Sequence, residues 1–489
     1  MSEFELLLPQ LACARTHLLD NLGRIRREVG PVTPERSDAL ADHMNLRRGD
    51  VAEVVSFYSY LTVPLETPRV CTGPVCDCLG AREVLAGTPG AIEVPCLGHC
   101  DLAPVALRGD DLVPPVVHRL APGESIDLGA PDEPREPPKL PPERVIDELR
   151  ASGLVGYGGA GFPAWRKWEA VRSRPGPRVV IVNADEGEPG TFKDRYVMEL
   201  RPHLLLEGLQ VAMEFAEAEE TYIYLREEYS TARQCLSTAI EERGLPVTIV
   251  VGAGSYVCGE ETALLESMEG RRGMPRLRPP FPAEAGHLGR PTLISNVETF
   301  AHIPAILRLG GEQWPRVRLW SVSGAVAEPG CYEAPVDATA RQLIEEHAGG
   351  ATAEIGAVVP GGSASGVLPP AALDTPLTRE ALAEWGCGVG SAGVQVFPAS
   401  YPVLRLVRET MRFFAEESCQ KCTPCRIGTR ALEHLLAELE EGHAVMSRER
   451  LGEWVEAMER GSICGLGQAA PAPLQTAMRH WPELFAAID

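Results

Sequence analysis

The sequence lacks the features that place a protein in or across a membrane. No run of about 18 apolar residues is present, which excludes a typical transmembrane helix and direct membrane insertion. A secretion signal is also missing, because Glu3 and Glu5 stand where such a signal carries positive charge and Pro9 interrupts the apolar stretch. Lys and Arg are scarce, 46 against 68 Asp and Glu, and the net charge of −22 argues against binding nucleic acid. We therefore expect a cytoplasmic protein.

Cysteine, by contrast, is abundant, with 14 residues in the chain. A reducing cytoplasm keeps thiols free, so clustered cysteines there predict metal or redox chemistry rather than structural disulfides. Eight of the 14 cysteines fall into two groups with spacing typical of metal ligands.

The chain divides into several predicted parts, since its 489 residues exceed the roughly 150 residues of one domain. A stretch with six prolines, residues 131–142, favours extended backbone that cannot join a packed element. We predict a cysteine-bearing domain over 1–120, a linker over 121–142, an α/β domain over 143–312, a small α+β domain over 313–400 and a helical bundle over 401–489.

The region after the linker alternates between strand and helix patterns. Residues 178–186, 221–227 and 246–254 are short apolar runs typical of buried strands, whereas 200–220 and 258–270 have helical periodicity. Strand–helix alternation predicts a mainly parallel sheet covered by helices.

The first cysteine group consists of Cys71 and Cys76, spaced C-x4-C, and Cys96 and Cys100, spaced C-x3-C. Four thiolates from two loops are what a 2Fe–2S cluster requires. A structural zinc site uses the same ligands, although zinc sites more often have C-x2-C spacing. The spacing therefore favours a 2Fe–2S cluster over zinc.

A glycine-rich segment, SGLVGYGGAGFPAW, contains Gly156, Gly158 and Gly161 in the pattern G-x-G-x-x-G. The usual dinucleotide-binding pattern follows a strand, but the preceding residues are helix-like, so that context is not met. Glycines let backbone amides approach a phosphate or ring closely, while a plain glycine-rich turn is the alternative.

Polar side chains follow the first predicted strand of the α/β region. Asn183, Asp185, Glu186 and Glu188 stand at its carboxyl end, where parallel sheets bind ligands. Beside a glycine cradle they are placed to hydrogen-bond a flavin ribityl chain and a nicotinamide ribose. The alternatives are a solvated loop or a helix cap.

A third element repeats the strand–glycine–helix pattern and places Glu260 and Glu261 in the first turn of a helix. Helix capping explains such carboxylates equally well. Near an adenosine ribose, a carboxylate repels a 2′-phosphate and so favours NAD over NADP.

The second cysteine group has Cys419, Cys422 and Cys425 in C-x2-C-x2-C spacing and Cys464 thirty-nine residues later. Three close thiolates with a remote fourth are typical of a 4Fe–4S cluster. A thioredoxin-like redox pair and a zinc site are the alternatives.

Several of these segments resemble subunits of respiratory complex I. VVSFYSYLTVP, CTGPVC and CLGHCDLAPV resemble its thioredoxin-like 2Fe–2S subunit, and residues from about 143 to the end resemble its FMN- and NADH-binding subunit. Residues 321–344 resemble the β-grasp, ubiquitin-like domain of that family. The resemblance implies an α/β multidomain protein with a thioredoxin-like 2Fe–2S domain, a Rossmann-like FMN/NAD domain, a β-grasp domain and a helical bundle holding a 4Fe–4S cluster.

The resemblance also implies specific contacts. Those expected for FMN are Gly156, Gly158, Gly159, Lys167, Asn183, Asp185, Gly259, Glu260, Asn296 and Thr299. Those expected for NADH are Phe162, Glu188, Tyr256, Glu261, Arg278 and Phe281, with the aromatic rings stacking and Glu188 positioning the nicotinamide. Three positions depart from the family: Tyr157 replaces an arginine, Arg278 a lysine, and Ser295 the first of two asparagines that face the flavin.

Nicotinamide exchanges two electrons as a hydride and iron–sulfur clusters exchange one, so a flavin must lie between them. VPGGSASGVLP, WGCGVGSAGV and SICGLGQAAP resemble the β subunit of NAD-dependent formate dehydrogenase. That resemblance implies a large iron–sulfur and molybdopterin α subunit, with molybdenum or tungsten, that oxidises formate. The alternatives are the NADH-input subunit of complex I or of an NAD-reducing hydrogenase, a flavin-less iron–sulfur relay, and a zinc-stabilised interaction protein.

Overall fold

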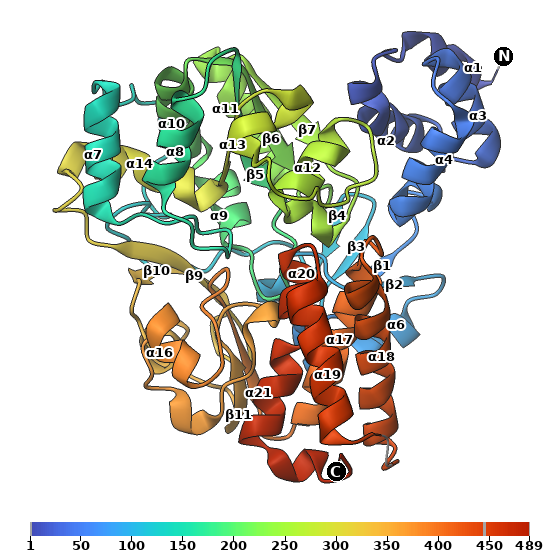
Figure 1. The fold of residues 1–489 in the computed structure, drawn as a ribbon, viewed down its shortest axis with the longest axis vertical. Coiled ribbons are helices and arrows are strands. Elements are labelled where there is room, and N and C mark those ends of the chain that lie inside the picture. The colour runs from blue at the N-terminus through green and yellow to red at the C-terminus, as the bar shows by residue number, and fades with distance from the viewer. Residues whose placement is uncertain (1, 444–445, 489) are drawn as a thin grey trace.

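Four parallel strands form a sheet at the centre of the molecule. The computed structural model describes residues 2–443 and 446–488. The central sheet has the order β7-β6-β5-β8, and all its neighbouring strands are parallel (Figure 1). Its strands are β5 (Arg178–Ala184), β6 (Ala218–Leu225), β7 (Val247–Val251) and β8 (Thr292–Asn296). The predicted parallel sheet is therefore confirmed.

The two faces of this sheet are covered by different parts of the chain. Val180 and Val182 on β5 pack into the main core with the helices that follow the linker. Val179 and Ile181 point to the opposite face, as the two-residue period of a strand requires. The helices of this region are α7 (Pro142–Ser152), α8 (Ala164–Arg172), α9 (Lys193–Leu200), α10 (Pro202–Ala216), α11 (Ser230–Arg243), α12 (Glu261–Met268), α13 (Pro282–Ala285) and α14 (Val297–Leu309).

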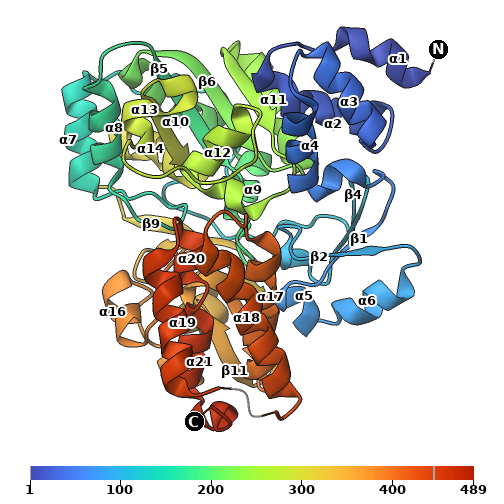
Figure 2. The ribbon, with the colours of Figure 1, turned by 45° about the vertical axis from the view of Figure 1, so that its right-hand side comes forward.

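The N-terminal helices cover the second face of the central sheet. They are α1 (Glu3–Leu7), α2 (Leu18–Glu28), α3 (Pro34–His43) and α4 (Arg48–Phe57), and their apolar side chains share one core with Val179, Ile181 and Ile294. The cysteine-bearing sheet that follows has a separate core. Figure 2 shows these helices and the cysteine-bearing strands as two distinct groups. The predicted domain 1–120 thus consists of two separately packed parts.

The cysteine-bearing sheet has the order β2-β1-β3-β4, with β1 parallel to β2 and antiparallel to β3. Its elements are β1 (Arg69–Cys71), α5 (Pro74–Cys78), α6 (Ala81–Gly87), β2 (Ile92–Val94), β3 (Ala106–Arg108) and β4 (Asp111–Val113).

The predicted linker begins as a packed segment. Its first residues, 124–127, wrap around Glu333, whose carboxylate accepts four backbone N–H bonds of 2.6 to 3.1 Å. Ile126 is fully buried and Leu128 is 4% exposed. The first residues assigned to the linker are therefore packed, because a buried carboxylate satisfies their amides, and they precede the proline-rich stretch 131–142 that is expected to be extended. The proline-rich part has no helix or strand until α7.

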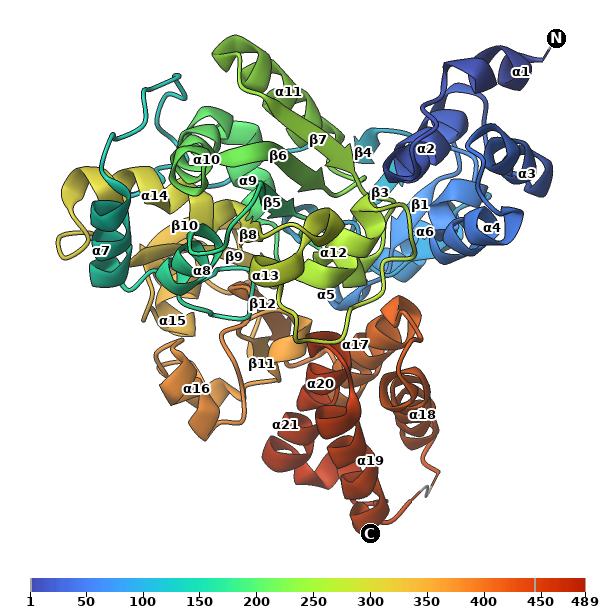
Figure 3. The same cartoon turned by 45° about the horizontal axis from the view of Figure 1, so that its top comes forward.

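The last two parts of the chain are a mixed sheet and a helical bundle (Figure 3). The sheet has the order β10-β9-β12-β11, in which only β9 and β12 pair in parallel. Its strands are β9 (Val317–Gly324), β10 (Gly330–Pro335), β11 (Ile355–Val359) and β12 (Gly393–Pro398), with helices α15 (Ala340–Gln342) and α16 (Arg379–Glu384). The bundle comprises α17 (Val403–Glu417), α18 (Thr423–Glu440), α19 (Arg448–Gly461), α20 (Gly465–Ala469) and α21 (Ala472–His480).

Within residues 2–443 and 446–488, no helix combines the length and the apolar character that crossing a membrane requires. All 14 cysteines are free thiols.

The contact between Glu333 and the linker predicts a protease phenotype. Glu333→Gln removes the charge that the four amides share, a loss of about 1.5 kcal/mol that corresponds to roughly tenfold more frequent opening of the segment. Trypsin cleavage after Arg135 or Lys139 should then be roughly tenfold faster. Glu328→Gln, an exposed change in the same domain, should leave the rate unchanged. Equal cleavage rates in both variants would contradict the anchoring role.

Candidate functional site

The predicted ligand-binding residues converge at the carboxyl edge of the central sheet. Asn183 lies near the end of β5, Gly259 lies beyond β7, and Asn296 ends β8. The side-chain amide of Asn183 donates a 2.8 Å hydrogen bond to the carbonyl oxygen of Gly259. Parallel strands end at the same edge, so residues far apart in the sequence meet there.

The glycine-rich segment folds against the start of α14. The amide of Gly156 donates to the carbonyl of Phe162 at 2.8 Å, which closes the loop. The amide of Tyr157 donates to the Thr299 hydroxyl at 3.0 Å. A Cβ on Gly158 would lie 3.4 Å from Cβ of Asn296, so the backbone runs close to that side chain. The structure therefore brings the predicted glycine loop to Asn296 and Thr299.

Lys167 connects three elements of the site. Its ammonium group on α8 forms an ion pair with Glu261 at the start of α12 and donates to the carbonyl of Ile294 on β8 at 2.9 Å. Both partners of the ion pair are partly exposed, so either can turn toward a ligand.

Glu188 is held from two sides. Its carboxylate accepts a 2.5 Å hydrogen bond from the Tyr256 hydroxyl and a 2.9 Å bond from the amide of Ala364. Burial raises the pKa of the Glu188 carboxyl, and these two hydrogen bonds partly offset that rise. Ala364 belongs to the mixed sheet domain, in which the sequence indicated no chemistry.

Two aromatic rings expected to stack on a dinucleotide are unusually exposed. Phe162 is 48% and Phe281 is 52% exposed to solvent. Arg278, three residues before Phe281, places a guanidinium nitrogen 3.7 Å from Oε1 of Glu260. Exposed aromatic side chains suit a surface that a planar ligand covers.

Two predicted contacts have other roles in the structure, and a third is buried. Glu186 accepts hydrogen bonds from the amides of Asp194 and Arg195 in the first turn of α9, at 2.9 and 3.1 Å, so it faces inward rather than toward a ligand. Glu260 accepts from the amides of residues 262 and 263, both at 2.9 Å, which is the helix-cap alternative. Ser295 is 8% exposed within β8.

A buried charge cluster beside Asn296 was not anticipated. The Asn296 side chain donates to Asp194 at 2.5 Å, and the Lys193 ammonium lies 2.7 Å from Asp194 and 2.9 Å from Glu298. The only sequence signal was the position of Lys193 and Asp194 shortly after the acidic strand end, where charged residues are usually solvated.

The four cysteines of the first group meet below the same edge, and each is at most 5% exposed. Hydrogen bonding to Cys76 and burial raise the pKa of the Cys71 thiol, and hydrogen bonding to Cys96 and burial raise that of Cys100. The amide of Gly98 donates to Sγ of Cys96 at 3.3 Å. Amides aimed at sulfur suit the thiolates of an iron–sulfur cluster.

The second group lies where α18 and α20 begin. Cys422 and Cys464 precede the first residues of these helices, and Cys425 lies in the first turn of α18. Burial, followed by the neighbouring thiols Cys422, Cys464 and Cys419, raises the pKa of Cys425 to about 12. Two helix N-termini thus point toward the anionic thiolates, which the helix dipole favours.

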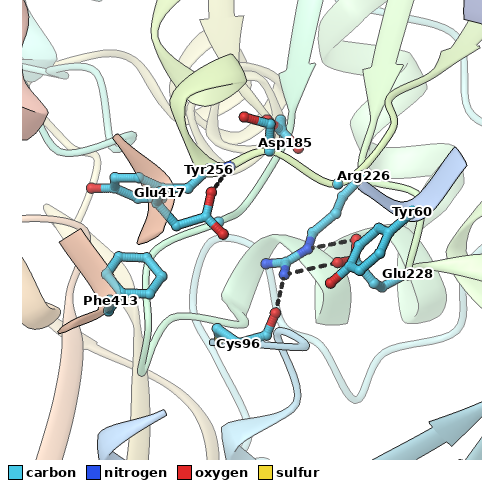
Figure 4. Close-up of a pocket in the computed structure, with 11 residues that line it drawn as sticks. Tyr60, Cys96, Asp185, Arg226, Glu228, Tyr256, Phe413 and Glu417 are labelled. Atoms are coloured by element: carbon cyan, nitrogen blue, oxygen red, sulfur yellow. Dashed lines mark hydrogen bonds and ion pairs between the residues drawn. The ribbon is translucent and has the colours of Figure 1, made fainter. Parts of the chain in front are cut away.

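A small cavity lies between Cys96 of the first group and Phe413 and Glu417 of α17, the helix that precedes the second group (Figure 4). Arg226 spans it, donating to the carbonyls of Glu186 at 2.6 Å and Cys96 at 2.7 Å. Asp185 faces this cavity, and its Oδ2 is buried without a hydrogen-bond partner among the described residues. An orphaned buried oxygen beside a tight glycine cradle fits a bound polar ligand such as a flavin.

Comparison with known proteins defines the class. The Nuo51 FMN-binding domain family matches residues 149–305, and the NADH-ubiquinone oxidoreductase-F iron-sulfur binding region matches residues 405–488. The chain is thus a subunit of a flavin-containing, iron–sulfur oxidoreductase. The predicted FMN-binding domain and 4Fe–4S region are confirmed, and the first cysteine group lies outside both matched ranges.

Relatives specify the family. The chain is 40% identical to the F 2 subunit of NADH-quinone oxidoreductase from Rhizobium meliloti (strain 1021), over 71% of this chain and 89% of that protein. It is also 40% identical to the mitochondrial NADH-ubiquinone oxidoreductase 51 kDa subunit of Neurospora crassa, over 70% and 77%. A chain of the NAD+-reducing [NiFe]-hydrogenase in the H2-reduced state superimposes with a TM-score of 0.88 and 29% identity, over 98% of this chain and 94% of that one. The chain belongs to the family of the 51 kDa, NADH- and FMN-binding subunits of NADH-quinone oxidoreductase.

Asp185 predicts a pH-dependent stability. Burial raises its pKa from 3.8 to about 8, so between these values the folded protein keeps a proton that the unfolded chain has lost. The stability of the wild type should therefore fall as pH rises through this window, by up to about 1.4 kcal/mol per pH unit. Asp185→Asn cannot titrate, so its melting temperature relative to wild type should rise from pH 5 to pH 8.

The matched control is Asp110→Asn, an exposed change. Its melting temperature should follow that of the wild type at every pH. A constant difference between Asp185→Asn and wild type over the same range would show that Asp185 is ionised in the folded protein.

Proposed function

We propose that this chain is the NAD(H)-side, or diaphorase, subunit of a larger oxidoreductase and moves electrons between NADH, FMN and two iron–sulfur clusters. The observation that carries this proposal is the meeting of the glycine loop, Asn183 and Asn296 at one sheet edge, with Cys96 of the first quartet lining the cavity below it and the second quartet at the starts of α18 and α20. Bound flavin would exchange two electrons at once with the nicotinamide and single electrons with the iron–sulfur clusters.

The residues of this chain have distinct tasks in the proposal. The backbone of the glycine loop, with Asn183, Asp185 and Asn296, binds and orients the flavin. Glu188 and Tyr256 orient the nicotinamide, and Phe162 and Phe281 cover the dinucleotide and exclude water. No residue is needed as an acid or base, because hydride transfer moves the hydrogen nucleus and both electrons together.

The carboxylate of Glu261 sets the proposed preference for NAD. It lies at the first position of α12, where its ion pair with Lys167 holds it near the site. The 2′-phosphate of NADP is negatively charged, so this carboxylate would repel it and weaken the binding of NADP.

For the first cysteine group the proposal is a 2Fe–2S cluster in a thioredoxin-like domain, with the mixed sheet as a β-grasp domain. The C-x4-C and C-x3-C spacing of the four cysteines supports a cluster over the zinc alternative. The amides of Gly98 and Gly190, which donate to Sγ of Cys96 and Cys100 at 3.3 Å, support it as well.

The metal and flavin content tests these assignments. The anaerobically purified protein should contain about six iron atoms, two plus four, and about one releasable FMN per chain. Cys96→Ser should lower iron to about four and Cys425→Ser to about two, each with FMN retained. Exposed Cys13 is no ligand, so Cys13→Ser should change nothing. Zinc in place of iron, or iron without FMN, would support the interaction-protein and relay alternatives respectively.

For the partner, we propose a hydrogenase-type complex rather than formate dehydrogenase. The hydrogenase chain superimposes on 98% of this chain, whereas the sequence alignments with the NADH-quinone oxidoreductase relatives cover about 71% of it. The three segments that resemble formate dehydrogenase include two that pack against each other. The amide of Gly388 donates to the carbonyl of Ser365 at 2.8 Å, and that of Ser391 to Gly361 at 3.0 Å. These contacts lie within the mixed sheet domain, so the resemblance of the two segments is no evidence of formate chemistry.

The native complex decides between these partners. It is expected to contain a large nickel-bearing subunit and to reduce NAD with hydrogen. Molybdenum or tungsten together with formate-dependent NAD reduction would instead establish the formate dehydrogenase α subunit as the partner. NADH oxidation coupled only to quinone would establish complex I.

A further inference from the structure

We infer that the loop of residues 361–366 in the mixed sheet domain is a positioning element for Glu188, and that Gly362 is the residue that makes this possible. The inference rests on the proposed nicotinamide site. Its basis is a contact between parts of the chain that are more than 170 residues apart: the amide of Ala364 donates to Oε1 of Glu188 at 2.9 Å.

The two oxygens of the Glu188 carboxylate are fixed by different domains. Oε1 is bound by Ala364 in the mixed sheet domain, and Oε2 is bound by the Tyr256 hydroxyl, which follows β7 of the central sheet, at 2.5 Å. One hydrogen bond therefore fixes the position of each oxygen. A carboxylate held in this way presents its remaining lone pairs to a ligand in a single orientation.

Gly362 allows this close approach. Its φ is +91°, and a Cβ built on it would lie 2.4 Å from Cγ of Glu188 and 2.9 Å from Oε1. Any other residue would have to displace either the loop or the glutamate side chain. The glycine is thus required by the contact with Glu188 as well as by its own backbone conformation.

The loop cannot move away easily, because it is packed on its other side. A Cβ on Gly361 would lie 2.3 Å from the carbonyl oxygen of Val389. At the end of the loop, the amide of Val367 donates to the Thr476 hydroxyl on α21 at 2.9 Å. The helical bundle and the mixed sheet therefore brace the loop, and an added methyl group displaces Glu188 instead.

Gly362→Ala tests the inference, with Gly350→Ala as the matched control. Gly350 lies in the same domain and has a φ of +90°, but open space surrounds the position of its Cβ. The two positions share a φ near +90° and differ in the contact with Glu188. Gly362→Ala should lower kcat/KM for NADH, with ferricyanide as acceptor, roughly ten- to a hundredfold through a raised KM. FMN and iron content should not change, and Gly350→Ala should resemble wild type.

A double-mutant cycle separates positioning from general damage. Glu188→Ala removes Cγ, so the methyl group of Gly362→Ala then has nothing to displace, and the double variant should be no worse than Glu188→Ala alone. If Gly362→Ala fails to fold, Glu188→Ala should restore folding for the same reason. Additive losses, absent rescue, or equal effects of Gly362→Ala and Gly350→Ala would overturn the inference.

Failure of this inference is distinguishable from failure of the proposed function. Wild-type protein whose flavin is not bleached by NADH contradicts the proposed function itself. Wild-type protein that is bleached, with Gly362→Ala behaving as Gly350→Ala does, contradicts only the role of the loop.

Discussion

The buried ion pair between Asp101 and Arg195 is the constraint on which the arrangement of the redox site depends. The guanidinium of Arg195 on α9 binds both carboxylate oxygens of Asp101, at 2.6 and 2.7 Å, and both side chains are completely buried. The Tyr196 hydroxyl donates to the same carboxylate at 3.0 Å. Removing one partner of such a pair costs about 3–5 kcal/mol, since the other charge stays buried without compensation. The pair therefore holds the loop that carries Cys100 in one position relative to the central sheet.

Buried basic side chains with acidic or carbonyl partners also occur within the site. Arg226 joins the loop of Cys96 to the strand end at Glu186, and Lys193 lies among carboxylates behind Asn296. A chain with a net charge of −22 thus places several of its basic residues inside, each with acidic or carbonyl partners. Fixed charges in a water-poor interior do not have to reorganise when electrons move, which is how a protein stabilises charge transfer at low cost.

Features that depend on neighbouring residues could be predicted from the sequence, whereas contacts between distant segments could not. The apolar run Val179–Val182 predicted a buried strand, and the cysteine spacing predicted the two ligand groups, because both signals come from the spacing of residues in the sequence. The docking of Glu188 on Ala364 was not readable, since it joins separate domains through a backbone amide that any residue supplies. Glu186 was assigned to the ligand because a carboxylate that caps a neighbouring helix has the same sequence signature as one that binds a ligand.

The N-terminal helices α1–α4 join the N-terminal region to the central sheet through a shared hydrophobic core. Val179, Ile181 and Ile294 form an apolar face of the central sheet, and α1–α4 bury it. Exposing such a face costs about 25 cal/mol for each Å² of apolar surface, so a chain without these helices needs another cover at the same place. The first part of this chain is therefore more than a carrier for four cysteines. It completes the hydrophobic core beneath the site. Because α1–α4 and the cysteine-bearing sheet are in the same chain as the flavin domain, one copy of each is present for every site.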